Sequence, residues 1–240
     1  MKKTKSLFIS KKNRVAATVG LLLLFCTPLT AQINKTVSIE FSPVFENKPL
    51  VLEQKYYSEN QKSDLAFTIF KCYVSHFVFY KNKQIVFNAD KTYFLLDSSK
   101  PESLKRKITI PENTTFDEIR CYLGVDDVTN NDGIGSGDLD PMKGMYWTWQ
   151  TGYINMKLEG FCKNSNTNDH GFQFHLGGFL EPYVAFQPIV LKNITTENIL
   201  IFIELNAFFE TISLKESNTV MSPSETTVAL SKKAALMFHL

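Results

Sequence analysis

The feature that most constrains the fold is a series of short runs of β-branched and aromatic residues, separated by turn-forming Asn, Gly, Pro or Lys residues. Such runs are typical of β-strands, because branched and aromatic side chains pack well on a pleated, half-buried surface. Ten runs can be identified, at residues 36–45, 65–80, 83–87, 92–97, 107–110, 118–125, 153–160, 172–178, 183–191 and 199–209. This spacing predicts an all-β chain, folded as a single-domain antiparallel β-sandwich with long loops.

Two local patterns add detail to this prediction. The stretch "FVFYKNKQIVF", residues 77–87, predicts a hairpin that turns at Asn82. Helical periodicity is weak except in the tail, "SPSETTVALSKKAALMF". There Ser222 is expected to cap a short C-terminal helix, with Pro223 at its first position. No repeat, linker or composition break divides residues 32–240, so one domain is expected there.

The N-terminus has the three parts of a secretory signal peptide. A basic stretch at residues 1–14 precedes the apolar run "VAATVGLLLLFC", and "TPLTAQ" then offers a small-residue cleavage site after Ala31. The apolar run is shorter than a membrane-spanning helix requires. We therefore expect residues 1–31 to be removed, leaving an exported protein of the periplasm or cell surface that is not an integral membrane protein.

Removal of residues 1–31 reverses the sign of the net charge. The chain has 26 basic and 24 acidic residues, a formal charge of +2, and six of the basic residues lie in the signal segment. The mature chain would then carry 20 basic and 24 acidic residues, a formal charge of −4. No basic patch remains, so a nucleic acid partner is not expected.

Three cysteines remain in the expected mature chain, Cys72, Cys121 and Cys162. An odd number permits at most one internal disulfide, and none of the three has the CxxC spacing of zinc or thioredoxin-like sites. The sequence leaves two alternatives open, namely one disulfide with a free thiol or three small buried residues.

An acidic, glycine-rich loop precedes the most aromatic segment of the chain. Hard oxygen ligands on a flexible loop suit Ca²⁺, although the EF-hand pattern fails because no Glu closes the loop at the required offset. The alternative is a long turn whose Asp and Asn side chains bond to its own backbone. The candidate residues are Asp126, Asp127, Asn130, Asp132, Asp138 and Asp140.

The segment "GMYWTWQTGY", residues 144–153, holds both tryptophans of the chain. If it is an extended strand, Met145, Trp147 and Trp149 lie on one face. In the later run "FQFHLGG", His175 lies on the face opposite the two phenylalanines. Imidazole and thioether are suitable copper ligands, but a lone histidine or a tryptophan pair is more often part of a hydrogen-bonded core.

The stretch "LGVDDVTNNDGIGSGDLDPMKGMYWTWQTGYINMKLEG", followed by "FQFHLGGF", resembles the MbnP-like family of bacterial exported copper-binding proteins. The runs "FTIFKCYVSHFVFY" and "ILIFIELNAFF" also correspond to strands of that family, so the resemblance covers nearly the whole mature chain. It implies a β-sandwich in which histidines bind copper beside a tryptophan. In the family, a dihaem peroxidase-like partner oxidises this tryptophan to kynurenine.

The resemblance assigns roles to particular residues. His175 matches the histidine of the family's FHLGG-type motif and is the expected copper ligand, while Trp147 and Trp149 lie in the tryptophan motif. A second ligand is expected among His76, Met145 and His170.

Two functions from different classes follow from these observations. The first is an exported copper-binding protein in copper uptake or storage, and the second is a non-metal or Ca²⁺-stabilised cell-surface interaction module. An enzyme is not expected, because no nucleophile, histidine and acid occur at a recognisable spacing. Asp138 and Asp140 are two residues apart in a loop, which does not define the carboxyl separation that acid–base chemistry requires.

The signal peptide gives the first testable prediction. N-terminal sequencing of the protein secreted by its native host should begin at or near Gln32, because Ala31 completes the small-residue cleavage motif. A mature protein that still begins at Met1 would contradict processing.

Overall fold

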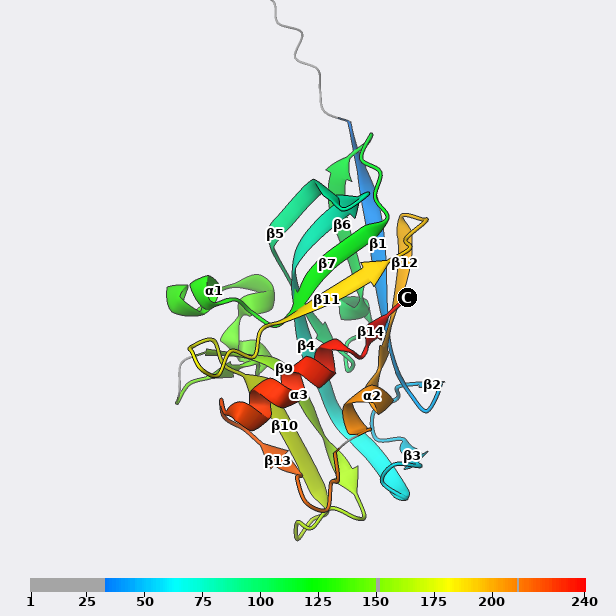
Figure 1. The fold of residues 1–240 in the computed structure, drawn as a ribbon. Helices are drawn as coiled ribbons and strands as arrows, with labels where there is room; N and C mark the ends of the chain where they lie inside the picture. Colours follow the sequence, from blue (N-terminus) through cyan, green and yellow to red (C-terminus); the bar gives the residue numbers. More distant parts are fainter. Residues whose placement is uncertain (1–32, 150–151, 211) are drawn as a thin grey trace, which may run out of the picture. The chain divides into compact units, whose positions relative to one another are not determined.

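The computed structural model describes residues 33–149, 152–210 and 212–240, which form two β-sheets with a few short helices (Figure 1). The larger sheet has the order β11-β7-β4-β9-β10-β13, with β3 and β5 also paired to β4 and β8 paired to β9. Its strands are β3 (Lys55–Ser58), β4 (Ser63–Lys81), β5 (Gln84–Asp97), β7 (Glu118–Leu123), β8 (Tyr146–Trp147), β9 (Gly152–Cys162), β10 (Gly171–Gly177), β11 (Gln187–Lys192) and β13 (Thr219–Val220). The expected signal peptide, residues 1–31, lies outside the described residues.

The smaller sheet is built around the N-terminal strand of the described chain. Its order is β14-β12-β1-β2, with β6 also paired to β1. Its strands are β1 (Asn34–Phe45), β2 (Lys48–Pro49), β6 (Lys105–Pro111), β12 (Asn198–Glu204) and β14 (Phe238–His239). The predicted all-β sandwich is confirmed, but it is not purely antiparallel, because β1 runs parallel to β12 and β10 runs parallel to β13.

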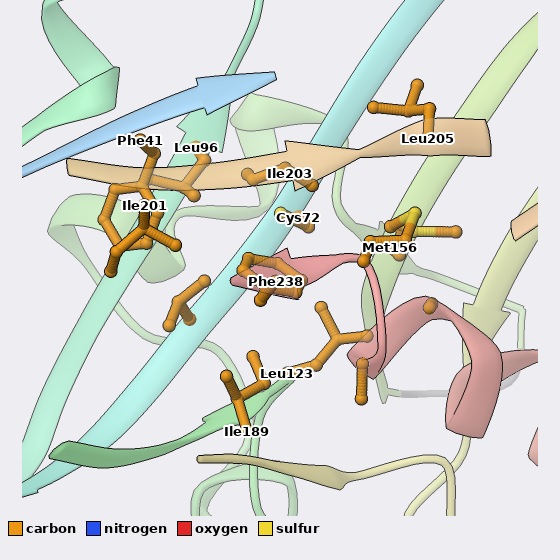
Figure 2. Close-up of a cluster of buried hydrophobic side chains, with 14 of the residues drawn as sticks. Phe41, Cys72, Leu96, Leu123, Met156, Ile189, Ile201, Ile203, Leu205 and Phe238 are labelled. Carbon is orange, nitrogen blue, oxygen red and sulfur yellow. The ribbon is translucent and has the colours of Figure 1, made fainter. Parts of the chain in front are cut away.

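The two sheets share one hydrophobic core. The alternation of side chains along each strand determines which residues enter it. In the larger sheet the register aligns Leu176, Met156, Cys72 and Leu96 across β10, β9, β4 and β5, and all four are buried in this core. Figure 2 shows side chains of both sheets in one cluster, including Ile201 and Ile203 from β12 and Cys72 and Met156 from β4 and β9. Each residue adjacent to this row along its strand must then point away from the core.

Several local predictions can be compared with the structure. The predicted hairpin is confirmed, since β4 ends at Lys81 and β5 begins at Gln84, and Asn82 and Lys83 both have positive φ angles, of 49° and 67°. Two positive φ angles are the signature of a two-residue type I′ turn. The run at 199–209 was expected to be one strand, but β12 ends at Glu204 and a short helix, α2 (Leu205–Phe209), follows.

The expected C-terminal helix is present as α3 (Glu225–Ala235), and it packs against β10, β11 and α2 (Figure 1). The predicted cap was wrong by two residues. Ser224, not Ser222, is the N-cap, and its Oγ accepts a hydrogen bond of 3.1 Å from the Thr227 backbone N–H. Ser224 is the cap because it immediately precedes the first helical residue, Glu225, and its hydroxyl therefore reaches the N–H of the third helical residue. Pro223, expected at the first position of the helix, lies before this cap and outside the helix.

The three cysteines are buried and unpaired, which agrees with the second of the two alternatives left open by the sequence. Burial raises the pKa of the Cys72 and Cys121 thiols, so both stay protonated and unreactive at neutral pH. None of the helices that the structure describes has the length and hydropathy to cross a membrane.

Candidate functional site

The outer face of the larger sheet carries a row of charged side chains. The register aligns His175, Lys157, Lys71 and Asp97 across β10, β9, β4 and β5, one residue away from the row that enters the core. Residues directly opposite in an antiparallel pair point to the same face, so these four share one surface. The expected placement of His175 away from Phe172 and Phe174 is therefore correct.

His175 is buried at the end of this row, with a side-chain exposure of 8%. Its Nε2 lies 2.6 Å from Oε1 of Glu159, and Lys157 Nζ lies 3.5 Å from the same carboxylate oxygen. Burial lowers the pKa of His175, while the hydrogen bond with Glu159 opposes that shift. One nitrogen of the imidazole is therefore hydrogen-bonded, and a lysine lies nearby. This environment is compatible with a purely structural role for His175.

Beside the charged row, the same outer face carries a second hydrophobic cluster. Tyr73 and Leu95, which come next along β4 and β5, pack there with Met145, Trp147 and Tyr153. Residues 126–147 cover this cluster, with the helix α1 (Asp127–Asp132) and two single-turn helices, Gly137–Leu139 and Pro141–Lys143. Figure 1 shows α1 standing off one side of the sheets.

The two tryptophans do not lie on one continuous strand face, as the alternation argument predicted. The strand β8 has only two residues, Tyr146 and Trp147, and a turn follows. Met145 and Trp147 are buried, whereas Trp149 is 66% exposed, although the two indole rings remain 5.8 Å apart. The prediction failed because it assumed an extended segment, while the chain turns immediately after a two-residue strand.

Trp147 packs against the strand that carries His175. A Cβ atom placed on Gly177 would lie 2.8 Å from Cζ3 of Trp147, so the indole rests against the Gly177 backbone. Gly177 is two residues after His175 on β10, which is roughly 7 Å along the same strand face. The structure therefore places the Trp147 ring against β10, the strand that carries His175.

The acidic loop is attached to the sheet by Asp138. Its Oδ1 lies 2.7 Å from Lys143 Nζ, and its Oδ2 lies 3.0 Å from Nη2 of Arg106 and accepts a 3.0 Å hydrogen bond from the Leu95 backbone N–H. The Tyr73 hydroxyl donates to the Asp138 carbonyl at 3.0 Å. One carboxylate thus connects the loop to β5 and to β6.

Other polar residues of the loop cap its short helices. Asp126 accepts a 2.8 Å hydrogen bond from the Thr129 N–H at the start of α1, and Asp140 accepts one of 2.9 Å from Met142 N–H. Asn130 Oδ1 accepts from the Tyr153 N–H, and Asp127 and Asp132 are exposed. Within the described part of the chain, no three acidic, histidine or cysteine side chains gather around one point, so a Ca²⁺ ion at this loop would lack the set of carboxylate ligands that it prefers. These contacts favour a loop held by its own side chains over the Ca²⁺ alternative, which stays a prediction.

His76 occupies a strained position in β4. The pairing of β4 with β5 shifts register between Ser75 and Phe77, and His76 at this bulge has a φ of +57°. Left-handed backbone is uncommon for a residue other than glycine and recurs at functional sites. The imidazole lies among three aromatic rings, with centroid distances of 5.3 Å to Tyr93, 5.4 Å to Phe186 and 6.1 Å to Tyr122.

The two ring nitrogens of His76 face different partners. Nδ1 lies 3.0 Å from Ser75 Oγ, and Nε2 lies 3.2 Å from Oδ2 of Asp126. The Tyr93 hydroxyl donates to the same Asp126 oxygen at 2.5 Å. Burial lowers the pKa of His76, and the opposing effect of Asp126 only partly offsets this shift. His76 is 22% exposed, so its ring is reachable from solvent.

The remaining histidine candidate, His170, lies apart from these residues. It precedes β10, with its Nδ1 3.2 Å from the Ser165 carbonyl, and it is five residues before His175, or roughly 16 Å along an extended chain. His76 is five residues along β4 from Lys71 and two strands away from His175, a separation of roughly 15–20 Å. The three histidines therefore cannot share one ion.

Some residues of these sites were not found from the sequence. Tyr93 lies in a predicted strand without any motif, and Glu159 lies in the "KLEG" end of the family-like stretch but was given no role. Arg106 meets Asp138 only because β6 and the loop are brought together by the fold. The only signal for these residues in the sequence was a polar side chain at a strand position facing the core or the loop. Many surface residues have the same feature, so it does not single out site residues.

The architecture defines a class of protein: a two-sheet β-sandwich whose outer sheet face is covered by a long acidic loop. The chain belongs to the MbnP family, whose sequence profile matches residues 34–222. A solved structure, MbnP from Methylosinus trichosporium, has the same fold, with a TM-score of 0.55 and 14% sequence identity over 80% of this chain and 82% of that chain. Among curated proteins, none matches this sequence. The resemblance inferred from the sequence motifs is thus confirmed at the level of the family.

The role of Asp138 gives a prediction about the loop. Asp138→Ala should lower the free energy of unfolding by about 1.5–3 kcal/mol, because three donors that bond to a charged acceptor lose it together. The measurement is urea denaturation followed by far-UV circular dichroism. Asp132→Ala, at the exposed end of α1, is the matched control and should change stability by less than about 0.5 kcal/mol.

EDTA should leave the unfolding midpoint of the wild-type protein unchanged if side chains alone hold the loop. A midpoint that falls with EDTA, together with an unaffected Asp138→Ala variant, would show instead that a bound cation holds the loop.

Proposed function

We propose that this protein is an exported, non-catalytic copper-binding protein of the MbnP family, acting in copper uptake or storage in the periplasm or at the cell surface. The family membership and the signal-like N-terminus support the setting, and the resemblance noted in the sequence supports the metal. Among the described histidines, His76 fits a copper site best, for a reason that concerns its protonation.

The hydroxyl of Ser75 determines which nitrogen of His76 carries the proton. Ser75 Oγ donates its only hydrogen to the Gly124 carbonyl, at 2.7 Å, so towards His76 it can only accept. Nδ1 must therefore be the protonated nitrogen, and in the neutral ring Nε2 presents a lone pair. That lone pair faces Oδ2 of Asp126 across 3.2 Å, so two acceptors face each other.

Two facing acceptors are unfavourable unless a cation or a hydrogen-bond donor lies between or beside them. A second proton on His76 would supply it, but burial lowers the pKa of this imidazole and disfavours that form. A metal cation supplies the charge without protonation, and a spacing of 3.2 Å suits two donors that each lie about 2.0–2.2 Å from one ion. This pair of facing acceptors is the observation that carries the proposal.

The surroundings of His76 are those that a ligating histidine needs. Metal-bound imidazoles usually donate their second N–H to a fixed acceptor, as Nδ1 does to Ser75 here. Asp126 is held by the Tyr93 hydroxyl and the Thr129 N–H. Imidazole nitrogen with carboxylate oxygen suits Cu(II). His175 instead already bonds to Glu159, beside the cationic Lys157, and this supports a structural role for it.

Copper titration of histidine variants tests this assignment. His76→Asn should weaken Cu(II) binding by at least tenfold, about 1.4 kcal/mol, because it removes the nitrogen ligand. Asn is the appropriate replacement, since it tolerates the left-handed backbone at this bulge. Binding is measured by competition with a chelator of known affinity, and circular dichroism checks the fold.

His175→Gln and His170→Gln are the matched controls, and both should keep wild-type affinity. Loss of binding in His175→Gln alone would move the copper site to β10. A wild-type protein that binds no copper in any form would leave the non-metal interaction module as the function.

The family resemblance also supports oxidation of a tryptophan to kynurenine by a dihaem partner, and exposure distinguishes the two tryptophans. Trp149 is 66% exposed and accessible to a partner protein, whereas Trp147 is 5% exposed. In protein isolated from its native host, we expect the mass change on Trp149. Trypsin leaves both residues in one peptide, 144–157, so fragment ions must locate the change. A modified Trp147 beside an intact Trp149 would contradict the argument from exposure.

A further inference from the structure

The C-terminal helix α3 buries only one of its faces. Leu230 and Ala234 are buried, whereas Glu225, Ala229 and Lys232 are exposed. Because each residue advances about 100° around an α-helix, positions 225, 229 and 232 form one stripe along it. The exposed stripe thus carries an acidic residue near one end of the helix, a small apolar residue in the middle and a basic residue near the other end.

The surface around this stripe is largely apolar. Leu236, which follows the last turn of α3, is 76% exposed, and Val228 is half-buried. A groove of about 420 Å³ lies between the helix and Pro182. Pro182 belongs to a turn in which the Tyr183 N–H donates to the Leu180 carbonyl, and both of these flanking side chains are exposed. Contiguous apolar surface of this kind is typical of an interaction site.

The order of charges along the stripe is complementary to itself. Glu225 and Lys232 are separated by about 10 Å along the helix axis, and the midpoint between them falls between Val228 and Ala229. If a second α3 lies antiparallel about that midpoint, each Glu225 meets Lys232 of the second copy, and the two apolar residues meet their own counterparts. The antiparallel arrangement also brings opposite ends of the two helix dipoles together. A parallel arrangement would instead place like charges opposite each other.

We propose that α3 is the centre of a homodimer interface, in which two copies of this chain pack antiparallel through the stripe from Glu225 to Lys232. The same patch is used on both copies, as two-fold symmetry requires. Ala229 at the centre is small, so the two helices can approach to the usual 8–10 Å between axes. Stable interfaces bury about 800 Å² on each partner, more than one face of an 11-residue helix offers, and the apolar turn at residues 180–183 extends the contact. The proposed copper ligands lie outside this patch, so the dimer is independent of copper binding.

Sedimentation velocity of the mature protein over a series of concentrations measures the association. Glu225→Lys sets two lysines against each other at both ends of the helix pair, and Lys232→Glu does the same with two glutamates. Each variant alone should raise the dimer dissociation constant by at least tenfold. In an equimolar mixture of the two variants, both opposite-charge pairs form again, so the mixture should associate about as tightly as the wild-type protein.

Lys107→Glu is the matched control, because it makes the same charge change at an exposed position of β6 and should associate like the wild-type protein. Circular dichroism checks that each variant folds. The proposal is overturned if the wild-type protein sediments as a monomer up to about 0.5 mM, if the two charge variants each associate like the wild-type protein, or if they are folded and do not recover association on mixing.

A further variant keeps the test decisive if either charge reversal prevents folding. Ala229→Glu changes an exposed residue and places two carboxylates beside the two-fold axis, so it should weaken association by at least tenfold. Unchanged association of Ala229→Glu would show that α3 does not form the interface.

Discussion

The arrangement of the whole outer face depends on the carboxylate of Asp138. It receives hydrogen bonds or ion pairs from Lys143, from Arg106 and from the Leu95 backbone, groups that belong to the loop, to β6 and to β5. These contacts hold residues 126–147 against the sheet, so that Met145 and Trp147 are buried and Asp126 meets His76. Without this attachment, the second hydrophobic cluster would be exposed and the proposed copper site would lose its carboxylate.

The buried His175 and the half-buried His76 show how similar residues acquire different chemistry from their hydrogen bonds. His175 has a carboxylate for its Nε2 and nothing in its described surroundings requires a cation. At His76, the Ser75 hydroxyl is already committed to Gly124, and this forces the Nε2 lone pair towards a carboxylate. The difference lies in one hydroxyl hydrogen, and it decides which imidazole would attract a metal ion.

Several features could be predicted from the sequence because they depend on local chemistry. The strands, the two-residue hairpin at Asn82 and Lys83 and the helix near the C-terminus follow from side-chain shape, turn preferences and capping. The face of His175 also followed, because the pairing of β10 with β9 keeps one register from Gly171 to Leu176. The orientation of Trp149 could not be predicted in this way. The strand β8 ends at Trp147, and side chains alternate between faces only within a strand.

The sequence by itself thus determined the fold class and the family, because both can be inferred from patterns along the chain without knowledge of long-range contacts. Only the tertiary structure decided which residues meet: His76 with Asp126, Trp147 with the Gly177 backbone, and Asp138 with Arg106. These pairs are separated by 50, 30 and 32 positions in the sequence. Such contacts depend on strand register and loop placement, which arise when the two faces of the larger sheet are buried against different partners.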